Sequence, residues 1–221
     1  MHFDHNTNSG IFITFEGGDG SGKSTQVKLL YKYLLENNYP VIMTREPGGT
    51  QISEQLRTIL LQGNVNKMNA ITEALIFLAA RSDNWEKLIK PALDSNKIVI
   101  CDRFQDSTIV YQGICNNINI NLLNNICNTI TNNMLPNRTY LINIDPVIGL
   151  KRSMRQDNVD IRFEHKSTEY HKRIQEAYLQ IANNNDRYLI IDGNLSIEEI
   201  NNIIIKDVWK IMGKAISKVT N

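Results

Sequence analysis

One short segment of the chain has the residue types and the spacing of a phosphate-binding loop. Residues 17–24 read GGDGSGKS, which matches the pattern G-x-x-x-x-G-K-[ST]. The glycines let the backbone curl so that its N–H groups face phosphate oxygens, and the positive end of the following helix adds to the attraction. Lys23 is expected to reach the β- and γ-phosphates of a nucleoside triphosphate. We expect the phosphates to contact the loop and the start of the helix: Gly17, Gly18, Asp19, Gly20, Ser21, Gly22, Lys23, Ser24 and Thr25.

A magnesium ion is expected beside this loop. The loop hydroxyl, here that of Ser24, is one ligand in such sites, and a carboxylate that ends a neighbouring apolar strand is the other. The segment KIVICD at residues 97–102 ends in Asp102. An aspartate that ends a strand is more often a turn or cap residue, but a phosphate loop nearby favours the metal-binding role. The sequence therefore predicts Mg²⁺ held by Ser24 and Asp102.

Five short apolar segments must position these groups, and they cover residues 11–15, 41–45, 97–102, 139–145 and 187–192. Longer segments with helical patterns separate them. This alternation predicts an α/β fold with a five-stranded parallel sheet and helices on both faces. Ligands of such sheets bind beyond the carboxyl ends of the strands. The charged residues at those ends are expected to face one crevice: Glu16, Asp19, Arg45, Glu46, Asp102, Arg103 and Asp145.

Composition narrows the classes of function. The 221 residues suit one domain over 11–221, after a polar extension at 1–10 that is expected to be disordered or a tag. A net charge of +1 gives no general attraction to nucleic acid or membranes, and no apolar segment approaches a membrane span. Three scattered cysteines suit a cytoplasmic protein with reduced thiols. The guanine-binding N-K-x-D motif of GTPases, the L-S-G-G-Q segment of transporter ATPases and DNA-binding motifs are absent.

Two arginines predict a second phosphate site. Arg45 and Arg103 lie at the ends of predicted strands, on the same edge of the sheet as the phosphate loop. Guanidinium groups bind phosphate with two parallel hydrogen bonds. We therefore expect the last phosphate of the triphosphate to pass to a nucleoside monophosphate and not to water.

Three further segments carry a family resemblance: TREPGGT from residue 44, EALIFLAARSDN from residue 73 and DRFQDSTIVYQG from residue 102. Together with the phosphate loop they resemble bacterial thymidylate kinase, over nearly the whole chain. The resemblance implies a phosphate-loop nucleoside monophosphate kinase fold with a mobile lid. It also implies a homodimer that transfers the γ-phosphoryl group of ATP to dTMP with Mg²⁺.

The resemblance implies roles for individual residues in binding dTMP. Phe77 would stack on thymine, and Arg81, one helical turn later, would bind the O4 edge of the base. Tyr111 would crowd the 2′ position of the sugar. Further polar contacts to the base, the 3′-hydroxyl and the acceptor phosphate would come from Thr108, Gln112, Asp19, Arg45, Arg57 and Arg103.

The lid is expected at about residues 150–164, LKRSMRQDNVDIRFE. Some members of the family carry a catalytic arginine in the phosphate loop, but here Gly20 follows Asp19, so a lid arginine must supply that charge. Arg155 is favoured for this role, with Arg152 and Arg162 as competitors, because DIRFE departs from the usual spacing at the end of the lid. The implied catalytic set is Lys23, Asp102, Arg103, Arg155 and Arg162.

Two alternatives remain open at this point. One is a kinase for another nucleotide, or for a nucleoside, on the same scaffold. A nucleoside kinase would need a carboxylate base for the 5′-hydroxyl and would have less need for Arg45 and Arg103. The other is a nucleotide-dependent switch or binding module with little catalysis, which would bind ATP without transferring phosphate to any monophosphate.

Overall fold

The computed structural model describes residues 10–62, 68–154, 166–183 and 185–217. Its centre is a five-stranded sheet in the order β2-β3-β1-β4-β5, and all four neighbouring pairs are parallel. The α/β fold with a five-stranded parallel sheet is therefore confirmed. The strands are β1 (Ile11–Glu16), β2 (Val41–Arg45), β3 (Ile98–Asp102), β4 (Arg138–Asn143) and β5 (Tyr188–Asp192).

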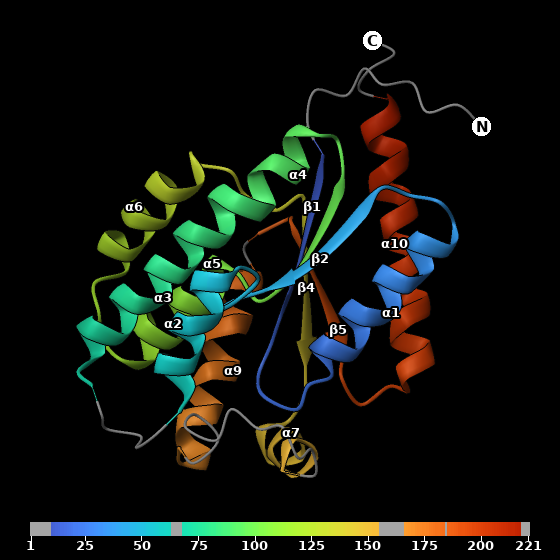
Figure 1. The fold of residues 1–221 in the computed structure, drawn as a ribbon. Helices are drawn as coiled ribbons and strands as arrows, with labels where there is room; N and C mark the ends of the chain where they lie inside the picture. Colours follow the sequence, from blue (N-terminus) through green and yellow to red (C-terminus); the bar gives the residue numbers. More distant parts are fainter. Residues whose placement is uncertain (1–9, 63–67, 155–165, 184, 218–221) are drawn as a thin grey trace.

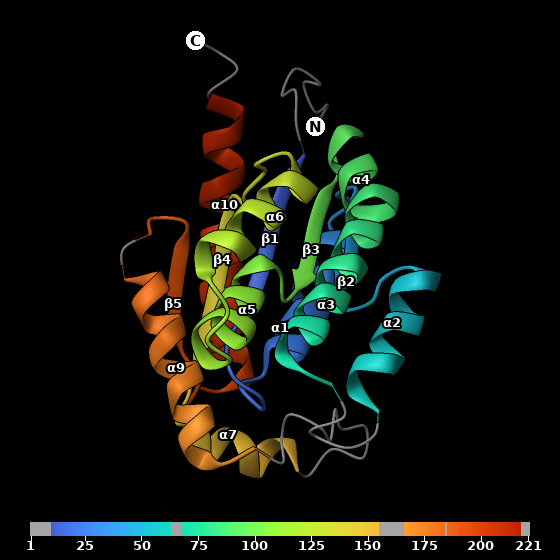
Figure 2. The same cartoon turned by 90° about the vertical axis from the view of Figure 1, so that its left-hand side faces the viewer.

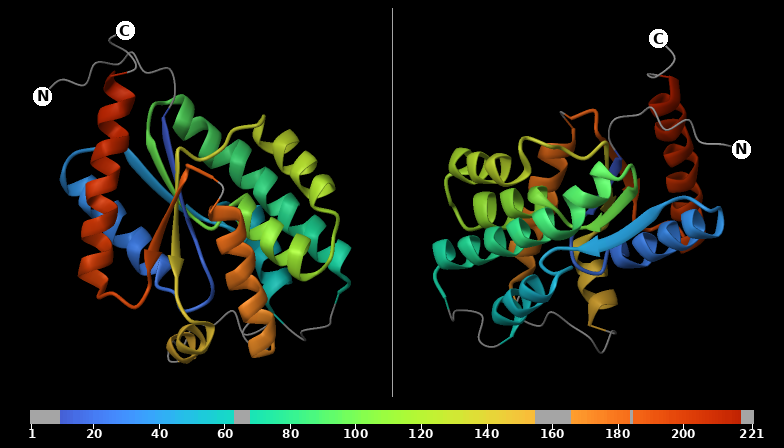
Figure 3. Two further views of the ribbon diagram at one scale, coloured as in Figure 1. Left: turned by 180° about the vertical axis from the view of Figure 1, so that it is seen from behind. Right: turned by 45° about the horizontal axis from the view of Figure 1, so that its top comes forward.

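Helices cover both faces of the sheet, as Figures 1 and 3 show. One face is covered by α1 (Lys23–Glu36) and α10 (Ile197–Ser217). The remaining helical segments lie on the other face or beyond the strand ends: α2 (Gln51–Leu61), α3 (Ala70–Asn84), η1 (Trp85–Ile89), α4 (Lys90–Asp94), α5 (Gln105–Thr108), η2 (Ile109–Cys115), α6 (Ile120–Thr131), α7 (Pro146–Ser153) and α9 (Thr168–Ala182). The segments η1 and η2 are π-helical.

Burial on both faces explains why strand β1 is mostly apolar and does not alternate between apolar and polar residues. Phe12 points to the face that holds Trp85 and Phe104, with its ring centroid 4.8 Å from that of Phe104. Ile13, the next residue, points to the opposite face and packs in the cluster that contains Leu30 of α1. A strand buried on both faces needs apolar residues at successive positions. Full burial of each such side chain contributes roughly 1.5–3 kcal/mol.

No helix within residues 10–62, 68–154, 166–183 and 185–217 is both long enough and apolar enough to cross a membrane. The polar extension expected at residues 1–10 falls almost wholly on residues that lie outside those described.

Helix α7 lies beyond the carboxyl ends of the strands, next to the turn that follows β1 (Figures 1 and 2). The two segments meet backbone to backbone at a pair of glycines. A Cβ on Gly20, where φ is +67°, would lie 1.9 Å from the carbonyl oxygen of Gly149 in α7. A Cβ on Gly149 would lie 2.5 Å from the carbonyl oxygen of Asp19. Side chains are excluded at both positions because the opposing atoms belong to the backbone and cannot rotate away.

This contact leads to a first prediction, on stability. Gly149→Ala should lower the free energy of unfolding by about 1–3 kcal/mol, since the new methyl group overpacks the contact with the turn. Gly213→Ala in α10 is the matched control, because a Cβ there meets nothing within 4 Å. The control should raise stability by about 0.5–1 kcal/mol through helix propensity alone. Urea unfolding of both variants measures the difference, and equal stabilisation by the two alanines would contradict the packing described.

Candidate functional site

The phosphate loop lies between β1 and α1, as its sequence predicts. Three of its glycines have a positive φ, namely Gly17 at +140°, Gly20 at +67° and Gly22 at +97°, and Gly22 is the N-cap residue of α1. Glycine adopts such conformations without the steric cost that a Cβ brings. The loop therefore brings its backbone to the N-terminus of a 14-residue helix, an arrangement that attracts anions.

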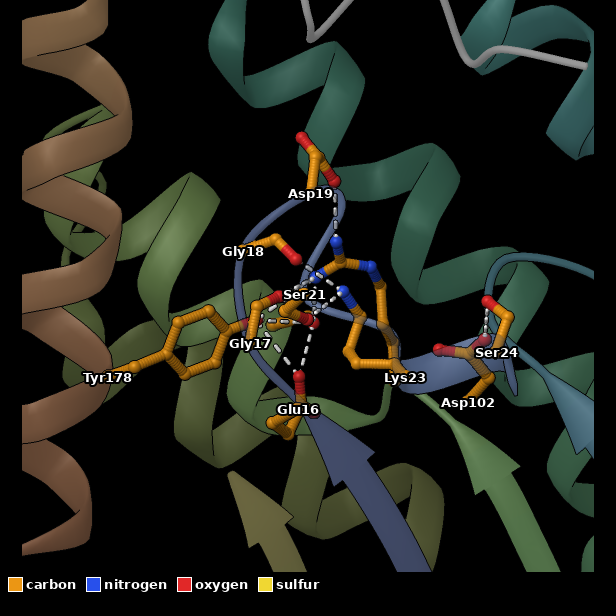
Figure 4. Close-up of polar contacts among 11 residues, drawn as sticks. Glu16, Gly17, Gly18, Asp19, Ser21, Lys23, Ser24, Asp102 and Tyr178 are labelled. Atoms are coloured by element: carbon orange, nitrogen blue, oxygen red, sulfur yellow. Dashed lines mark hydrogen bonds and ion pairs between the residues drawn. The ribbon is translucent and has the colours of Figure 1, made fainter. Parts of the chain in front are cut away.

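Lys23 folds back over this loop (Figure 4). Its Nζ donates to the carbonyl oxygen of Gly18 at 2.6 Å and lies 3.4 Å from the hydroxyl of Ser21. Burial and the nearby positive charge of Arg103 lower the pKa of Lys23 from 10.5 to about 8. Asp102, Asp19 and Glu16 act on the buried ammonium group only through their charges, and no carboxylate is hydrogen-bonded to it among the described residues. An anion bound in the loop would supply a direct partner.

Ser24 and Asp102 meet at the other side of the loop. The hydroxyl of Ser24 donates to the Asp102 carboxylate, and Asp102 ends β3, the neighbour of β1. Both groups are hard oxygen donors of the kind that Mg²⁺ prefers, and together they leave most of its coordination positions to water and phosphate. The part of the chain that the structure describes has no cluster of three or more potential ligands among His, Cys, Asp and Glu. The pair fits a magnesium ion shared with a phosphate, and it does not form an all-protein metal cage.

Arg103 follows Asp102 and has a left-handed backbone, with φ of +67°. Such a conformation is unfavourable for a residue with a side chain. Two hydrogen bonds hold it here: the backbone N–H donates to Phe15 O at 2.9 Å, and the thiol of Cys101 donates to the Arg103 carbonyl at 3.0 Å. The conformation directs the guanidinium toward the phosphate loop.

The guanidinium of Arg103 binds the phosphate loop directly. Its Nη2 forms an ion pair with Asp19 at 2.8 Å, and its Nη1 donates to the carbonyl oxygen of Gly17 at 3.1 Å. It also lies against the ring of Tyr111, 5.2 Å from the centroid. Arg103 therefore lies beside the loop with Asp19 as its partner, and its role in binding an acceptor phosphate stays a prediction.

Glu16, the last residue of β1, is the centre of a buried cluster that sequence analysis did not assign. Its carboxylate accepts hydrogen bonds from the backbone N–H of Phe104 at 2.8 Å, from Ser107 Oγ at 2.7 Å and from Tyr178 OH at 2.9 Å. Burial, together with the negative charge of Asp106, raises the pKa of Glu16 from 4.5 to about 7. A carboxylate before the phosphate loop is visible in the sequence, but no sequence signal links it to Tyr178 of α9.

The residues expected to bind the base come together between α3 and the 105–115 segment. Arg81 is 2% exposed, and its Nη1 donates to Thr108 Oγ1 at 2.9 Å. Its Nε forms an ion pair with Glu46 at 2.7 Å. Burial raises the pKa of Glu46, and the positive charge of Arg81 opposes that shift. The orientation of Arg81 is thus fixed from two sides, by Glu46 and by Thr108.

Phe77 and the other two expected base and sugar contacts occupy the same region. Phe77 is half-buried and packs against the apolar cluster that includes Tyr111. Gln112 is buried, and its Nε2 donates to Glu73 Oε1 at 3.1 Å. Sequence analysis missed Glu73, although it lies in the same motif as Phe77.

Arg45 and Arg57 lie farther out, toward α2. Arg45 neighbours Asp102 in the register of β2 and β3, but its exposed side chain pairs with Glu54 of α2 at 3.0 Å. Arg57 Nη1 donates to the carbonyl oxygen of Pro47 at 2.8 Å. The two arginines thus tie the end of β2 and the turn after it to α2.

Two further expectations concern the far side of the loop. Asp145 caps α7, accepting hydrogen bonds from the backbone N–H groups of Val147 at 2.8 Å and Ile148 at 3.3 Å. Arg152 donates to the carbonyl oxygen of Gly193 at 2.9 Å. Arg155 and Arg162, with most of the expected lid, lie outside the described residues.

Comparisons with known proteins agree with this arrangement. The family model described as thymidylate kinase matches residues 15–204. The thymidylate kinase of Symbiobacterium thermophilum is 42% identical over 91% of this chain and 94% of its own length. That of Finegoldia magna is 43% identical over 86% and 93%. The crystal structure of thymidylate kinase from Ehrlichia chaffeensis superposes with a TM-score of 0.73 at 34% identity, over 90% of this chain and 98% of that one. The chain therefore belongs to the thymidylate kinase family.

Proposed function

We propose that this protein transfers the γ-phosphoryl group of ATP to dTMP, giving dTDP and ADP, by an Mg²⁺-dependent in-line reaction. The observation that carries the proposal is the ion pair of 2.8 Å between Arg103 and Asp19. It puts the arginine suited to an acceptor phosphate directly against the loop suited to the donor phosphates. Membership of the thymidylate kinase family supports the choice of substrates.

The donor side binds ATP through the loop 17–24 and the N-terminus of α1. Lys23 neutralises charge on the β- and γ-phosphates, and the loop N–H groups orient the same oxygens. Ser24 and Asp102 would hold Mg²⁺, which would supply further positive charge to the bound phosphates. A triphosphate thus meets positive charge from a side chain and from a helix dipole.

The acceptor side binds dTMP by its phosphate, with Arg103 as the inner contact and Arg45 and Arg57 toward the mouth. An oxygen of that phosphate attacks the γ-phosphorus while the bond from phosphorus to the bridging oxygen of ADP breaks. The attacking oxygen is already ionised at neutral pH, so the reaction needs no strong general base. Catalysis then consists of alignment and charge neutralisation.

The base and sugar of dTMP occupy the region between α3 and the 105–115 segment. Phe77 stacks on thymine, and Arg81, held by Glu46 and Thr108, binds the O4 edge. The remaining proposed contacts are Thr108 and Gln112 to the base, Tyr111 at the 2′ position and Asp19 at the 3′-hydroxyl. Because the buried Arg81 is already oriented, the site selects the base by hydrogen bonding more than by apolar contact. Sites of this kind discriminate strongly between substrates.

Several further features are part of this proposal. The single domain over 11–221 rests on chain length and the cytoplasmic location on the scattered cysteines, whereas the lid at about 150–164 and the homodimer rest on the resemblance. Closure of a lid would exclude water that otherwise hydrolyses ATP. Sedimentation velocity would give the mass in solution and so test the homodimer.

A coupled ADP-release assay with MgATP and a panel of acceptors tests the proposed function. The panel contains dTMP, dUMP, dCMP, dGMP, AMP, UMP and thymidine. We expect dTMP to exceed dUMP in kcat/KM by about tenfold, as one methyl group allows, and to exceed dCMP by about 10² or more. A higher kcat/KM for dUMP than for UMP would agree with the proposed crowding of the 2′ position by Tyr111. Turnover with a different monophosphate alone would discard the base pocket, and ATP binding without transfer to any acceptor would favour the switch alternative.

The lowered pKa of Lys23 predicts that ATP binding depends on pH. In the free enzyme Lys23 loses its proton above about pH 8, whereas bound phosphates favour its charged form. ATP binding should therefore take up close to one proton at pH 9 and weaken by up to about tenfold per pH unit above 8. Calorimetry in two buffers with different ionisation enthalpies measures the uptake. Lys23→Met is the control and should show no uptake, and equal apparent enthalpies for the wild type in both buffers would contradict the assignment.

The absence of an arginine from the phosphate loop leads to a prediction on the lid. Arg155→Ala should lower kcat by about 10³ or more while the dissociation constants of both nucleotides change little, because the charge is needed mainly in the transition state. Arg152→Ala and Arg162→Ala are the comparison variants. Single-turnover kinetics distinguish them, and an unchanged kcat in the Arg155 variant would transfer the role to one of the other two.

A further inference from the structure

Arg103 reaches a second set of groups besides the phosphate loop. Its Nη1 lies 3.2 Å from Ser107 Oγ and 3.2 Å from Tyr178 OH. Both hydroxyls also contact the Glu16 carboxylate, at 2.7 and 2.9 Å, and each other at 2.8 Å. Glu16 itself is 0% exposed. A buried carboxylate thus lies behind the arginine, with two hydroxyls between them (Figure 4 shows Glu16 and Tyr178 in contact).

The positions of the hydrogens follow from the chemistry of these groups. An arginine only donates hydrogen bonds, an ionised carboxylate only accepts them, and each hydroxyl has one hydrogen. Both hydroxyls can donate to Glu16 Oε2, or one can donate to Oε2 while the other donates to its neighbouring hydroxyl. In either arrangement both hydroxyl hydrogens are used, and oxygen lone pairs are left for Arg103 Nη1. An ionised Glu16 therefore leaves acceptors on the side that faces the arginine.

We propose that Glu16 is a positioning residue for Arg103, acting through the hydroxyls of Ser107 and Tyr178. The inference rests on the proposed function, in which Arg103 holds the phosphate of dTMP. Glu16 also accepts a hydrogen bond from the backbone N–H of Phe104 at 2.8 Å. It therefore fixes the backbone directly after Arg103 as well as the guanidinium group. Among the described residues, Glu16 forms no hydrogen bond with Ser24 or Asp102.

Loss of the charge on Glu16 would change this arrangement of hydrogen bonds. A protonated carboxyl group, or an amide in its place, has a hydrogen that one of the hydroxyls must accept. That hydroxyl then turns its own hydrogen toward the other hydroxyl or toward Arg103. Arg103 cannot accept a hydrogen bond, so the acceptors that face it are no longer fixed, and the guanidinium loses a fixed position.

The surroundings put this proton within reach of physiological pH. Burial and Asp106 of α5 raise the pKa of Glu16 to about 7, while Arg103 and the bonds from Ser107 and Phe104 oppose the rise. Asp106 is itself paired with Arg187 at 2.6 Å. Arg187 interacts with Glu16 as well, and so do four further titratable groups: Lys23 of α1, Cys101 of β3, Tyr178 of α9 and Tyr188 of β5. Glu16 is charged above this pH and neutral below it.

The first test compares Glu16→Gln with the wild type across pH 5.5–9. At pH 8 the variant should lose roughly 10- to 100-fold in kcat/KM for dTMP, the range of a charged hydrogen bond, with KM for ATP within about twofold. The ratio of variant to wild type should rise toward one below pH 7, because the wild-type carboxyl group is then neutral too. Ionisation of the dTMP phosphate cancels in this ratio, since it affects both enzymes equally.

The second test uses two tyrosines in like surroundings. Tyr178→Phe removes one of the two hydroxyls and should lower kcat/KM for dTMP by about tenfold. Tyr140→Phe is the matched control: Tyr140 OH donates to Asp207 at 3.1 Å, and Asp207 pairs with Arg138 at 2.8 Å. These three residues thus form a second buried group of a tyrosine, a carboxylate and an arginine, placed away from the phosphate loop. Both variants should lose similar stability, but the control should keep kcat/KM for dTMP within about twofold.

The outcomes separate this inference from the function on which it rests. Absence of dTMP turnover by the wild type would overturn the proposed function and this role with it. Wild-type turnover with a variant-to-wild-type ratio that does not change with pH would overturn only the role of Glu16. So would equal losses of dTMP turnover in the two tyrosine variants, because the effect would then follow stability and not the position of Arg103.

Discussion

The ion pair between Arg103 and Asp19 is the interaction on which the rest of the site depends. It joins the end of β3 to the loop that follows β1, two neighbouring strands whose carboxyl ends face the same way. To reach Asp19, Arg103 adopts a left-handed backbone that costs of order 1–3 kcal/mol. The bonds from Phe15 and Cys101 offset that cost, so the strain is retained in the folded enzyme.

A second arginine is fixed by the same means on the base side. Arg81 is almost fully buried, and it is held by Glu46 and Thr108 before any substrate arrives. A buried ion pair of this kind adds little net stability, but loss of one partner is costly because the other charge is left unpaired. The ion pair instead fixes the orientation of Arg81. A hydrogen-bond donor that is already oriented needs no rearrangement when a charged group or the polar edge of a base binds to it. The enzyme thus keeps its two key arginines in fixed positions by placing a carboxylate next to each.

Much of the fold was readable from the sequence because it depends on local patterns. Apolar β-branched segments gave all five strands, and glycines followed by Lys23 and Ser24 gave the loop and the start of α1. The same logic could have placed Asp145, since an aspartate before Pro146 is a helix-capping signal; the expectation that it would face the crevice passed over that signal.

The sequence did not predict the side-chain contacts between segments that lie far apart in the chain. Glu16 meets Tyr178 only because α9 packs across the end of β1, and Glu46 meets Arg81 only because α3 lies beside the turn after β2. These contacts depend on tertiary packing and not on spacing along the chain. A carboxylate at a strand end marks a place to look, but its partner is chosen by the fold.

The contact between Gly20 and Gly149 has a consequence for how this family can vary. Because backbone meets backbone, neither position can gain a side chain unless the other segment retreats. The two glycines therefore form one unit of evolutionary constraint, although they belong to different parts of the chain. A homologue with a larger residue in this part of the loop must have moved the helix away, and the space opened by that retreat is where an arginine carried by the loop would have to fit.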